Sequence, residues 1–259
     1  MKLGIISWIR EEDFIKVKDK GLSFVELDVN DRAEEFLAHV DEVKEYSERY
    51  ELPVQAVGRW GSGRICKDGI RGEELALECR LIEAAASLGC TIYITGCNYV
   101  EELSYYENCQ LAISYFEKLI AFGKQKGVRI ATYNCRWNNF VCDAMAYTVI
   151  HGYLKDLYIK YDTSHCIYAG GDYLQEARDW GGRFIHVHIK GALLIDGKRF
   201  DDPPAGMDMT NWGAFFSVLY EKGYEEGLSI EPHSATWHGE LGDKGVDYTI
   251  AYIRKVKLL

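Results

Sequence analysis

Short apolar runs alternate with longer amphipathic stretches along the whole chain. Eight runs predict strands, at residues 3–7, 23–28, 53–57, 91–95, 128–133, 157–162, 184–190 and 228–231. Each is followed by a stretch that predicts a helix, at 11–20, 31–50, 73–88, 108–126, 141–152, 173–180, 211–222 and 247–257. Eight such units predict one (β/α)8 barrel (TIM barrel), a single α/β domain over residues 1–259. An open doubly wound sheet is the alternative, but no GxGxxG follows the first strand.

Polar residues lie near the carboxyl ends of the last three predicted strands. Because side chains alternate between the two faces of a strand, His188 and Lys190 share a face, and the positions between them are apolar. The same alternation turns Asp162 and Glu231 toward the barrel interior. The active site of such a barrel lies at this end of the strands. Two carboxylates and an imidazole suit Mn, Mg, Co or Zn, so we predict one divalent metal ion on Asp162, His188 and Glu231.

Composition narrows the possible partners. Hydrophobic residues make up 47% of the chain and charged residues 27%, as in ordinary globular proteins. The formal charge of -10 argues against a nucleic-acid partner, although a local basic site for a sugar phosphate is compatible with it. No apolar run approaches the ~20 residues that span a membrane. The eight cysteines form no CxxC pair, and with no signal peptide evident we expect reduced thiols in a cytoplasmic protein.

Aromatic and basic residues follow two of the predicted strands. Arg59 and Trp60 come after the third strand, and Arg136 with neighbouring amides comes after the fifth. An aromatic ring beside a guanidinium group suits a sugar ring that carries an anionic group. These three residues are therefore candidate substrate contacts.

The loop at 198–208 is too long for a plain connection and includes Arg199. It is expected to be a lid beside the substrate, with Arg199 a further candidate contact, or else a surface or oligomer contact. His233 follows the eighth strand, where it can orient Glu231 or bind substrate. Because the loops are rich in aromatic residues, we expect a homo-oligomer.

The segments YDTSH, HVHIK and SIEPH, together with VELD on the second strand, resemble the xylose-isomerase-like barrels. That family includes sugar-phosphate isomerases, ketose 3-epimerases and inosose dehydratases. The resemblance implies one divalent metal held by Glu, Asp, His and Glu from strands five to eight, and Asp162, His188 and Glu231 match the last three. It also implies that His165 contacts substrate oxygens and that Lys190 is the lysine of an H-x-K-D run, here followed by glycine.

The fifth strand departs from the family pattern. Tyr133 stands where relatives carry the first glutamate, and Cys135 stands where they often carry histidine. The resemblance implies that two glutamates exchange a proton with an enediolate, and only Glu231 of that pair is present. In one reading Asn134 or a water completes the coordination, and Tyr133, a phenol with a reference pKa of ~10, donates the opposing proton.

Two other readings follow from the same departure. An enzyme with one base suits β-elimination or a same-face proton shift better than epimerisation, and β-elimination would make the protein a carbohydrate lyase, a dehydratase or a subunit of one. A chain that has lost its metal is a non-catalytic sugar-binding or partner subunit. The leading prediction is a metal-dependent isomerase or epimerase of a small sugar, polyol or sugar phosphate, with Glu231, Tyr133 and Lys190 as its catalytic residues.

Overall fold

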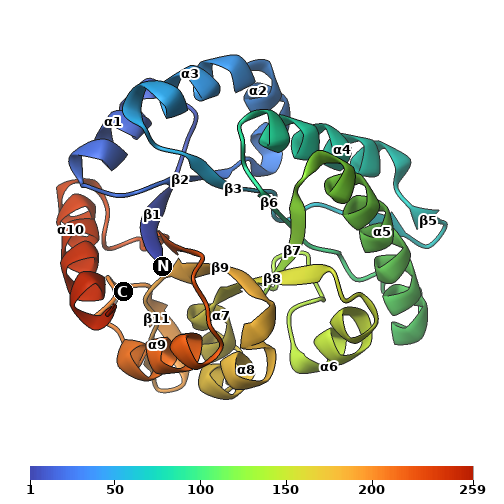
Figure 1. Ribbon diagram of the computed structural model, residues 1–259. Coiled ribbons are helices and arrows are strands. Elements are labelled where there is room, and N and C mark those ends of the chain that lie inside the picture. Colours follow the sequence, from blue (N-terminus) through green and yellow to red (C-terminus); the bar gives the residue numbers. More distant parts are fainter. Residues whose placement is uncertain (259) are drawn as a thin grey trace.

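Eight parallel strands close into a barrel in the computed structural model, which describes residues 1–258 (Figure 1). Their order around the barrel is β1-β12-β9-β8-β7-β6-β3-β2, so that β1 pairs with both β12 and β2. The strands are β1 (Lys2–Ser7), β2 (Val25–Asp28), β3 (Val54–Gly58), β6 (Ile92–Thr95), β7 (Arg129–Tyr133), β8 (Leu157–Asp162), β9 (Phe184–Ile189) and β12 (Gly227–Ile230). The predicted (β/α)8 barrel is confirmed, and each predicted strand matches an observed one.

Helices surround the strands as an outer ring (Figure 1). They are α1 (Glu11–Asp19), α2 (Ala33–Ala38), α3 (Val40–Tyr50), α4 (Gly72–Ser87), α5 (Tyr105–Lys126), α6 (Ala144–Ala146), α7 (Thr163–Tyr168), α8 (Tyr173–Trp180), α9 (Trp212–Glu221) and α10 (Gly239–Val256). The single helix expected at 31–50 is broken at His39, which has φ -118° and ψ 17°. The helix expected at 141–152 is mostly a π-helical turn, Tyr147–His151.

Two hairpins occupy long loops that we expected to be irregular. β4 (Ile65–Cys66) pairs with β5 (Gly69–Ile70) after β3, and β10 (Leu193–Ile195) pairs with β11 (Lys198–Asp201) after β9. Asp196 and Gly197 join the second pair with φ of 52° and 71°. Two successive left-handed residues make the Asp-Gly turn that favours a hairpin. This signal was present in the sequence and identifies part of the expected lid as a strand pair.

Side-chain alternation divides the apolar core from a partly polar barrel interior. Val25 and Leu27 of β2 pack in the main core, between the strands and the helices, while Glu26 is fully buried inside the barrel. One half of the interior is apolar and contains Ile92, Ile94, Ala131 and Tyr133 from β6 and β7. The other half is polar and positions the site described below.

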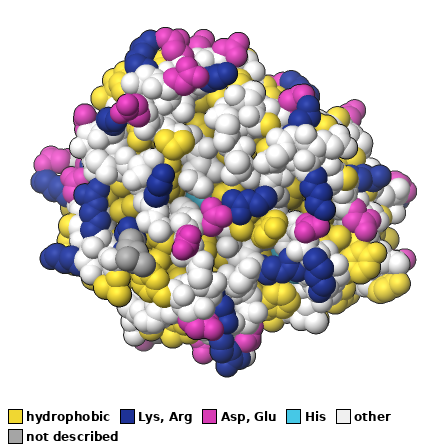
Figure 2. Space-filling view, in the orientation of Figure 1, with side chains coloured by type: hydrophobic (Ala, Val, Ile, Leu, Met, Phe, Trp, Pro, Cys, Tyr) yellow, Lys and Arg dark blue, Asp and Glu magenta, His cyan; other side chains and the backbone are white. Residues whose placement is uncertain are grey.

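The outer surface combines both signs of charge. Basic and acidic side chains are interspersed over the face shown in Figure 2. Within residues 1–258, no helix has the length and apolar character needed to cross a bilayer.

Candidate metal and sugar site

Asp162, His188 and Glu231 meet at the carboxyl ends of neighbouring strands. Asp162 ends β8, where it lies beside His188 of β9, and Glu231 follows β12. Each offers a ligand atom, and these atoms all lie within 4.8 Å of one another. Metal–ligand bonds of about 2.0–2.2 Å place the ligands of one ion about 3–4.4 Å apart. Oδ2 of Asp162 is buried and accepts no hydrogen bond from the described residues, so the three donors fit one divalent ion.

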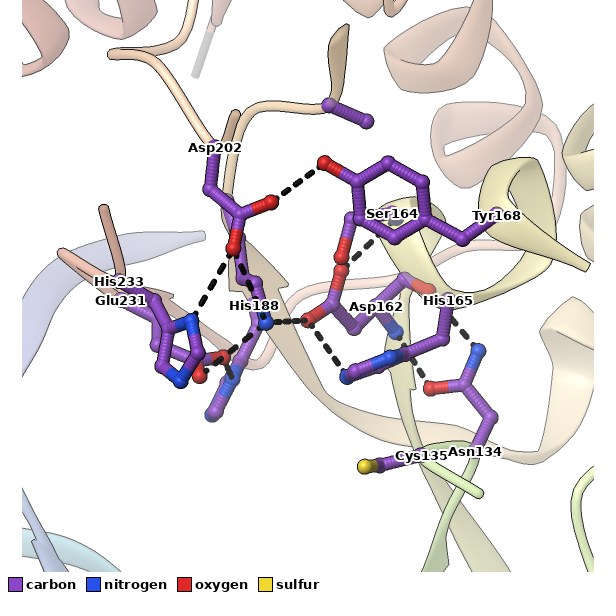
Figure 3. Close-up of polar contacts among 12 residues, drawn as sticks. Asn134, Cys135, Asp162, Ser164, His165, Tyr168, His188, Asp202, Glu231 and His233 are labelled. Carbon is purple, nitrogen blue, oxygen red and sulfur yellow. Dashed lines mark hydrogen bonds and ion pairs between the residues drawn. The ribbon is translucent and has the colours of Figure 1, made fainter. Parts of the chain in front are cut away.

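His188 is held from below by Glu26 of β2. Its Nε2 lies 2.9 Å from Oε2 of Glu26. Its Nδ1 lies 2.6 Å from Oε2 of Glu231, and Figure 3 shows His188 beside Glu231. Burial, the largest single effect, lowers the pKa of His188, but the charge of Glu26 and the hydrogen bonds to Glu231 and Glu26 together outweigh it, and the pKa is raised. His188 therefore shares its ring protons between two carboxylates. A metal ion would replace the Nδ1 proton, while Glu26 keeps the ring in the orientation that presents Nδ1.

Lys190 lies among the carboxylates of the site. Its Nζ is 3.4 Å from Glu231, 3.9 Å from Asp162 and 4.0 Å from Asp202. Burial alone would lower the pKa of Lys190, yet these carboxylates raise it, so the side chain carries a positive charge. Burial, the largest single effect, opposes ionisation of Glu231, but Lys190, His188 and Lys160 together outweigh it and keep the pKa of Glu231 well below the usual range.

A short helix places His165 beside Asp162. Oδ1 of Asp162 accepts a hydrogen bond from the backbone N–H of Ser164, at 2.8 Å, and so caps α7. Nε2 of His165 then lies 3.4 Å from Oδ2 of Asp162. Burial lowers the pKa of His165 to about 4, more than Asp162 raises it, so the imidazole is neutral near pH 7 and can bond a hydroxyl group.

A cavity of about 340 Å³ opens beside these groups; we call it the mouth cavity. It is lined by Ile6, Asp28, Asn30, Trp60, Cys135, Trp137, Lys160, His165, His188, Lys190, Arg199, Glu231 and His233. The sequence had predicted seven of these residues at the site: Trp60, His165, His188, Lys190, Arg199, Glu231 and His233. Figure 3 shows Glu231 and His233 on one side and Asp162 and His165 on the other. The structure brings most of the expected substrate contacts together.

Arg59 and Arg136 lie elsewhere, contrary to expectation. Arg59 is buried, and its guanidinium group donates to Glu74 at 2.6 Å and to Glu78 at 2.9 Å. Arg136 is exposed and lies 3.8 Å from Asp143. The loop beyond a strand sets the direction of these side chains, and strand alternation carries no information about it.

Tyr133 and Asn134 also have other partners than those expected. The hydroxyl group of Tyr133 donates to the carbonyl of Trp137 and accepts from the N–H of Gly61, both at 3.2 Å. Burial raises the pKa of Tyr133 to about 12. The amide of Asn134 bonds the backbone N–H and C=O of Asp162, at 3.0 and 2.8 Å. Asn134 therefore holds β7 to β8 under the aspartate, and neither side chain lines the mouth cavity.

The β10–β11 hairpin contributes groups that the sequence did not single out. Asp202, which follows β11, is buried, and its Oδ2 lies 3.0 Å from Nδ1 of His233. It also accepts hydrogen bonds from Arg199 and Tyr168. The hydrogen bond to Asp202 raises the pKa of His233. This cluster ties the hairpin to the loop after β12, next to Glu231.

Asp28 is another residue that the sequence did not assign to the site. It ends β2 and lines the mouth cavity, and its Oδ1 is buried without a hydrogen-bond partner among the described residues. Burial, followed by the charges of Glu26 and Glu231, raises its pKa to about 7. Side-chain alternation in VELD puts Asp28 on the same face of the strand as Glu26, and that is its only signal in the sequence.

Replacing Asp28 with Asn should make the protein more stable at high pH. The pKa of Asp28 is about 7 in the folded chain and has a reference value of 3.8, so the folded state retains a proton that the unfolded chain has lost. Stability contributed by this proton falls as the pH rises from about 4 to about 7. We expect Asp28→Asn to raise the free energy of unfolding by about 1–4 kcal/mol near pH 8 and by less near pH 5. Urea unfolding of the metal-free proteins at pH 5 and pH 8 measures the free energy of unfolding of the variant and of the wild type. A difference between them that does not change with pH would contradict the prediction. Asp31→Asn, at an exposed position, is the control.

Comparisons with known proteins identify the barrel. The model of the xylose isomerase-like TIM barrel family matches residues 14–256. A curated relative, the uncharacterized protein YfiH of Bacillus subtilis (strain 168), is 26% identical over 164 residues, which is 55% of this chain and 52% of YfiH. That match spans only about half the length of the relative.

Solved structures share the fold at low sequence identity. Apo 3-keto-D-glucoside 4-epimerase YcjR from E. coli has a TM-score of 0.77 and 19% identity, covering 98% of this chain and 99% of its own. D-allulose 3-epimerase from Methylomonas sp. has a TM-score of 0.81 and 14% identity, covering 99% and 98%. The IOLI protein with a bound zinc atom has a TM-score of 0.76 and 17% identity, also covering 99% and 98%. With its family model matched over nearly all of its length, this chain belongs to the xylose isomerase-like TIM barrel family.

Proposed function

We propose that this protein is a divalent-metal-dependent isomerase or epimerase of a small sugar or polyol. The observation that carries the proposal is the convergence of Asp162, His188 and Glu231 beside a cavity of about 340 Å³. Cationic, imidazole and aromatic side chains line that cavity, and these are groups that bind hydroxyl groups and sugar rings. The names of the structural neighbours, two sugar epimerases and a zinc-bound protein, support the same class.

The residues of the site divide into three roles. A divalent ion on Asp162, His188 and Glu231 would supply polarisation of a carbonyl group and its neighbouring hydroxyl. Glu231 lines the cavity, and its depressed pKa keeps it ionised, so it can accept a proton from the carbon next to that carbonyl. Lys190 and His165 would hold substrate oxygens.

A one-base reaction, such as β-elimination, is the second candidate. The residue that replaces the usual glutamate of the fifth strand is Tyr133, whose hydroxyl group already has two backbone partners. Its pKa of about 12 makes it a poor acid near pH 7. Glu231 is then the only carboxylate present of the expected acid–base pair. One base favours proton removal on one face of the substrate, followed either by departure of a leaving group from the neighbouring carbon or by return of the proton on the same face.

Metal content and solvent exchange test the proposal together. Purified protein is expected to retain about one equivalent of Mn, Co or Zn and, with a suitable ketose, to incorporate deuterium from D₂O at the carbon next to the carbonyl. Glu231→Gln should lower that exchange by ~10²–10⁴-fold, the usual contribution of a general base. Protein that neither retains nor binds a divalent ion would exclude the metal-dependent enzyme.

Tyr133→Phe distinguishes the two candidate reactions. The variant removes only the hydroxyl group, and the ring that packs on Trp60 with centroids 5.4 Å apart is kept. We expect exchange to continue within a few-fold of the wild-type rate, because the phenol does not face the cavity. A loss as large as that of Glu231→Gln would instead make Tyr133 the second proton donor. Metal-bound protein that exchanges with none of the ketoses, but releases water from a sugar acid or glycoside, would support elimination.

A further inference from the structure

A second cavity lies next to the mouth cavity, at the ends of β1 and β2. Its volume is about 510 Å³, larger than the mouth cavity, and we call it the side cavity. Both cavities are lined by Ile6, Asp28 and Asn30, so they adjoin at these three residues. Small-molecule sites usually measure about 300–1,000 Å³. The mouth cavity lies at the lower end of this range, which suits one sugar ring, and the side cavity has room for more.

Two tryptophans give the side cavity an aromatic lining. Trp8 follows β1 and is half-buried, and the guanidinium group of Arg32 stacks 3.6 Å from the centre of its ring. Trp237 follows β12, and its backbone N–H donates to Oγ of Ser234 at 3.0 Å. A Cβ at Gly245 of α10 would lie 3.1 Å from the Trp237 ring, so glycine allows the indole to pack closely on that helix. Both rings are therefore held in place.

Polar groups surround these rings. Asp13 and Lys16 of α1 line the side cavity, and His238 lines it from the start of α10. Flat aromatic rings with a few hydrogen-bonding groups around them are suited to binding a sugar or aromatic ring. Asp28 lines both cavities and has a buried carboxyl oxygen without a hydrogen-bond partner among the described residues. A hydroxyl group beside the bond that joins two rings would supply that partner.

We propose that the substrate is a two-ring glycoside, with the reacting sugar in the mouth cavity and a glycosidically linked second ring in the side cavity. The proposal rests on the proposed function, because the reacting ring is placed beside Asp162, His188 and Glu231. It extends that function by naming the substrate class. The second ring is either another sugar or an aromatic aglycone, since Trp8 and Trp237 can bind both.

Calorimetric titration of the full-length chain, with and without Mn²⁺, tests this. D-fructose is compared with isomaltulose, a two-ring ketose, and methyl β-D-glucoside is compared with phenyl β-D-glucoside. We expect the two-ring member of at least one pair to bind about tenfold more tightly, or ~1.4 kcal/mol. An advantage confined to isomaltulose identifies a second sugar, and an advantage confined to the phenyl glycoside identifies an aromatic aglycone.

Matched tryptophan variants identify which cavity causes the tighter binding of the two-ring ligand. Trp8→Ala is expected to remove most of the tenfold preference, and Trp8→Phe to restore it. Trp137→Ala is the control, because Trp137 lines the mouth cavity and not the side cavity, so the variant should weaken both members of a pair and keep their ratio. If Trp8→Ala does not fold, Trp237→Ala replaces it.

The outcomes separate this proposal from the proposed function. Equal affinity for one-ring and two-ring ligands, or a preference that survives both Trp8→Ala and Trp237→Ala, overturns the second-ring site and leaves the metal site untouched. If no sugar binds to metal-loaded protein, the proposed function fails and this proposal fails with it.

Discussion

Asp162→Asn is expected to lower the affinity for a divalent metal ion by more than ~100-fold. Mutating a residue that only hydrogen-bonds to a metal ligand and orients it lowers metal affinity by about 10–100-fold. Asp162→Asn removes a charged ligand itself, so the loss of affinity should be larger. Asparagine keeps the size of the side chain and caps a helix as well as aspartate does, so the cap on the N–H of Ser164 is retained. The fold should therefore survive while the metal is lost.

Metal content by mass spectrometry and a thermal shift on adding Mn²⁺ or Zn²⁺ measure the effect. Because a ligand that binds only the folded state stabilises it, the wild-type melting temperature should rise with metal concentration, and that of Asp162→Asn should not. Asp172→Asn is the matched control, since Asp172 caps α8 on the exposed surface and Asn should cap it equally well. An equal thermal shift in wild type and Asp162→Asn would remove Asp162 from the metal site.

Glu78→Ala is expected to lower the free energy of unfolding by about 3–5 kcal/mol. Glu78 is fully buried on α4 and accepts hydrogen bonds from Arg59 at 2.9 Å, Arg64 at 3.2 Å and Tyr93 at 2.7 Å. Arg64 is also fully buried, so the substitution leaves a guanidinium group without its charge partner inside the protein. An unpaired buried charge is among the most destabilising changes that one substitution can make.

Glu83→Ala is the matched control for urea unfolding. Glu83 lies on the same helix and pairs with Lys126 at 2.5 Å, but it is exposed, and such surface pairs contribute about 0–1 kcal/mol. A loss of less than about 1 kcal/mol for Glu78→Ala would mean that water or another carboxylate compensates the arginines. If Glu78→Ala is too unstable to purify, Glu78→Gln replaces it. Its free energy of unfolding should fall by less than that of Glu78→Ala but by more than that of Glu83→Ala.

Strand alternation predicted the barrel and the centre of the site for one physical reason. Every strand has two faces, and in a barrel one of them must point inward. Polar residues at alternate positions near the carboxyl ends, such as Asp162 and His188, were thereby assigned to the interior without any knowledge of the loops. The structure places both of them there, fully or almost fully buried.

Residues beyond the strand ends could not be predicted in the same way. Arg59 is the first residue after β3, yet its direction depends on Glu74 and Glu78, which lie beyond the β4–β5 hairpin on α4. Asp202 reaches the site only because a hairpin forms between β9 and α9. Such contacts join segments far apart in the sequence, and no local pattern in one chain encodes them.

The β10–β11 hairpin has a consequence for how this barrel can acquire new specificities. Within residues 1–258 it pairs with no barrel strand. Arg199 of β11 nevertheless lines the mouth cavity, and Asp202, which follows β11, contacts His233 in the lining of that cavity. Phe200 on the same hairpin is 65% exposed, so little of the core depends on it. Exchanging this strand pair between related chains should alter which substrates are accepted while the eight-stranded scaffold folds as before. Selection could thus change the hairpin independently of the proposed metal ligands.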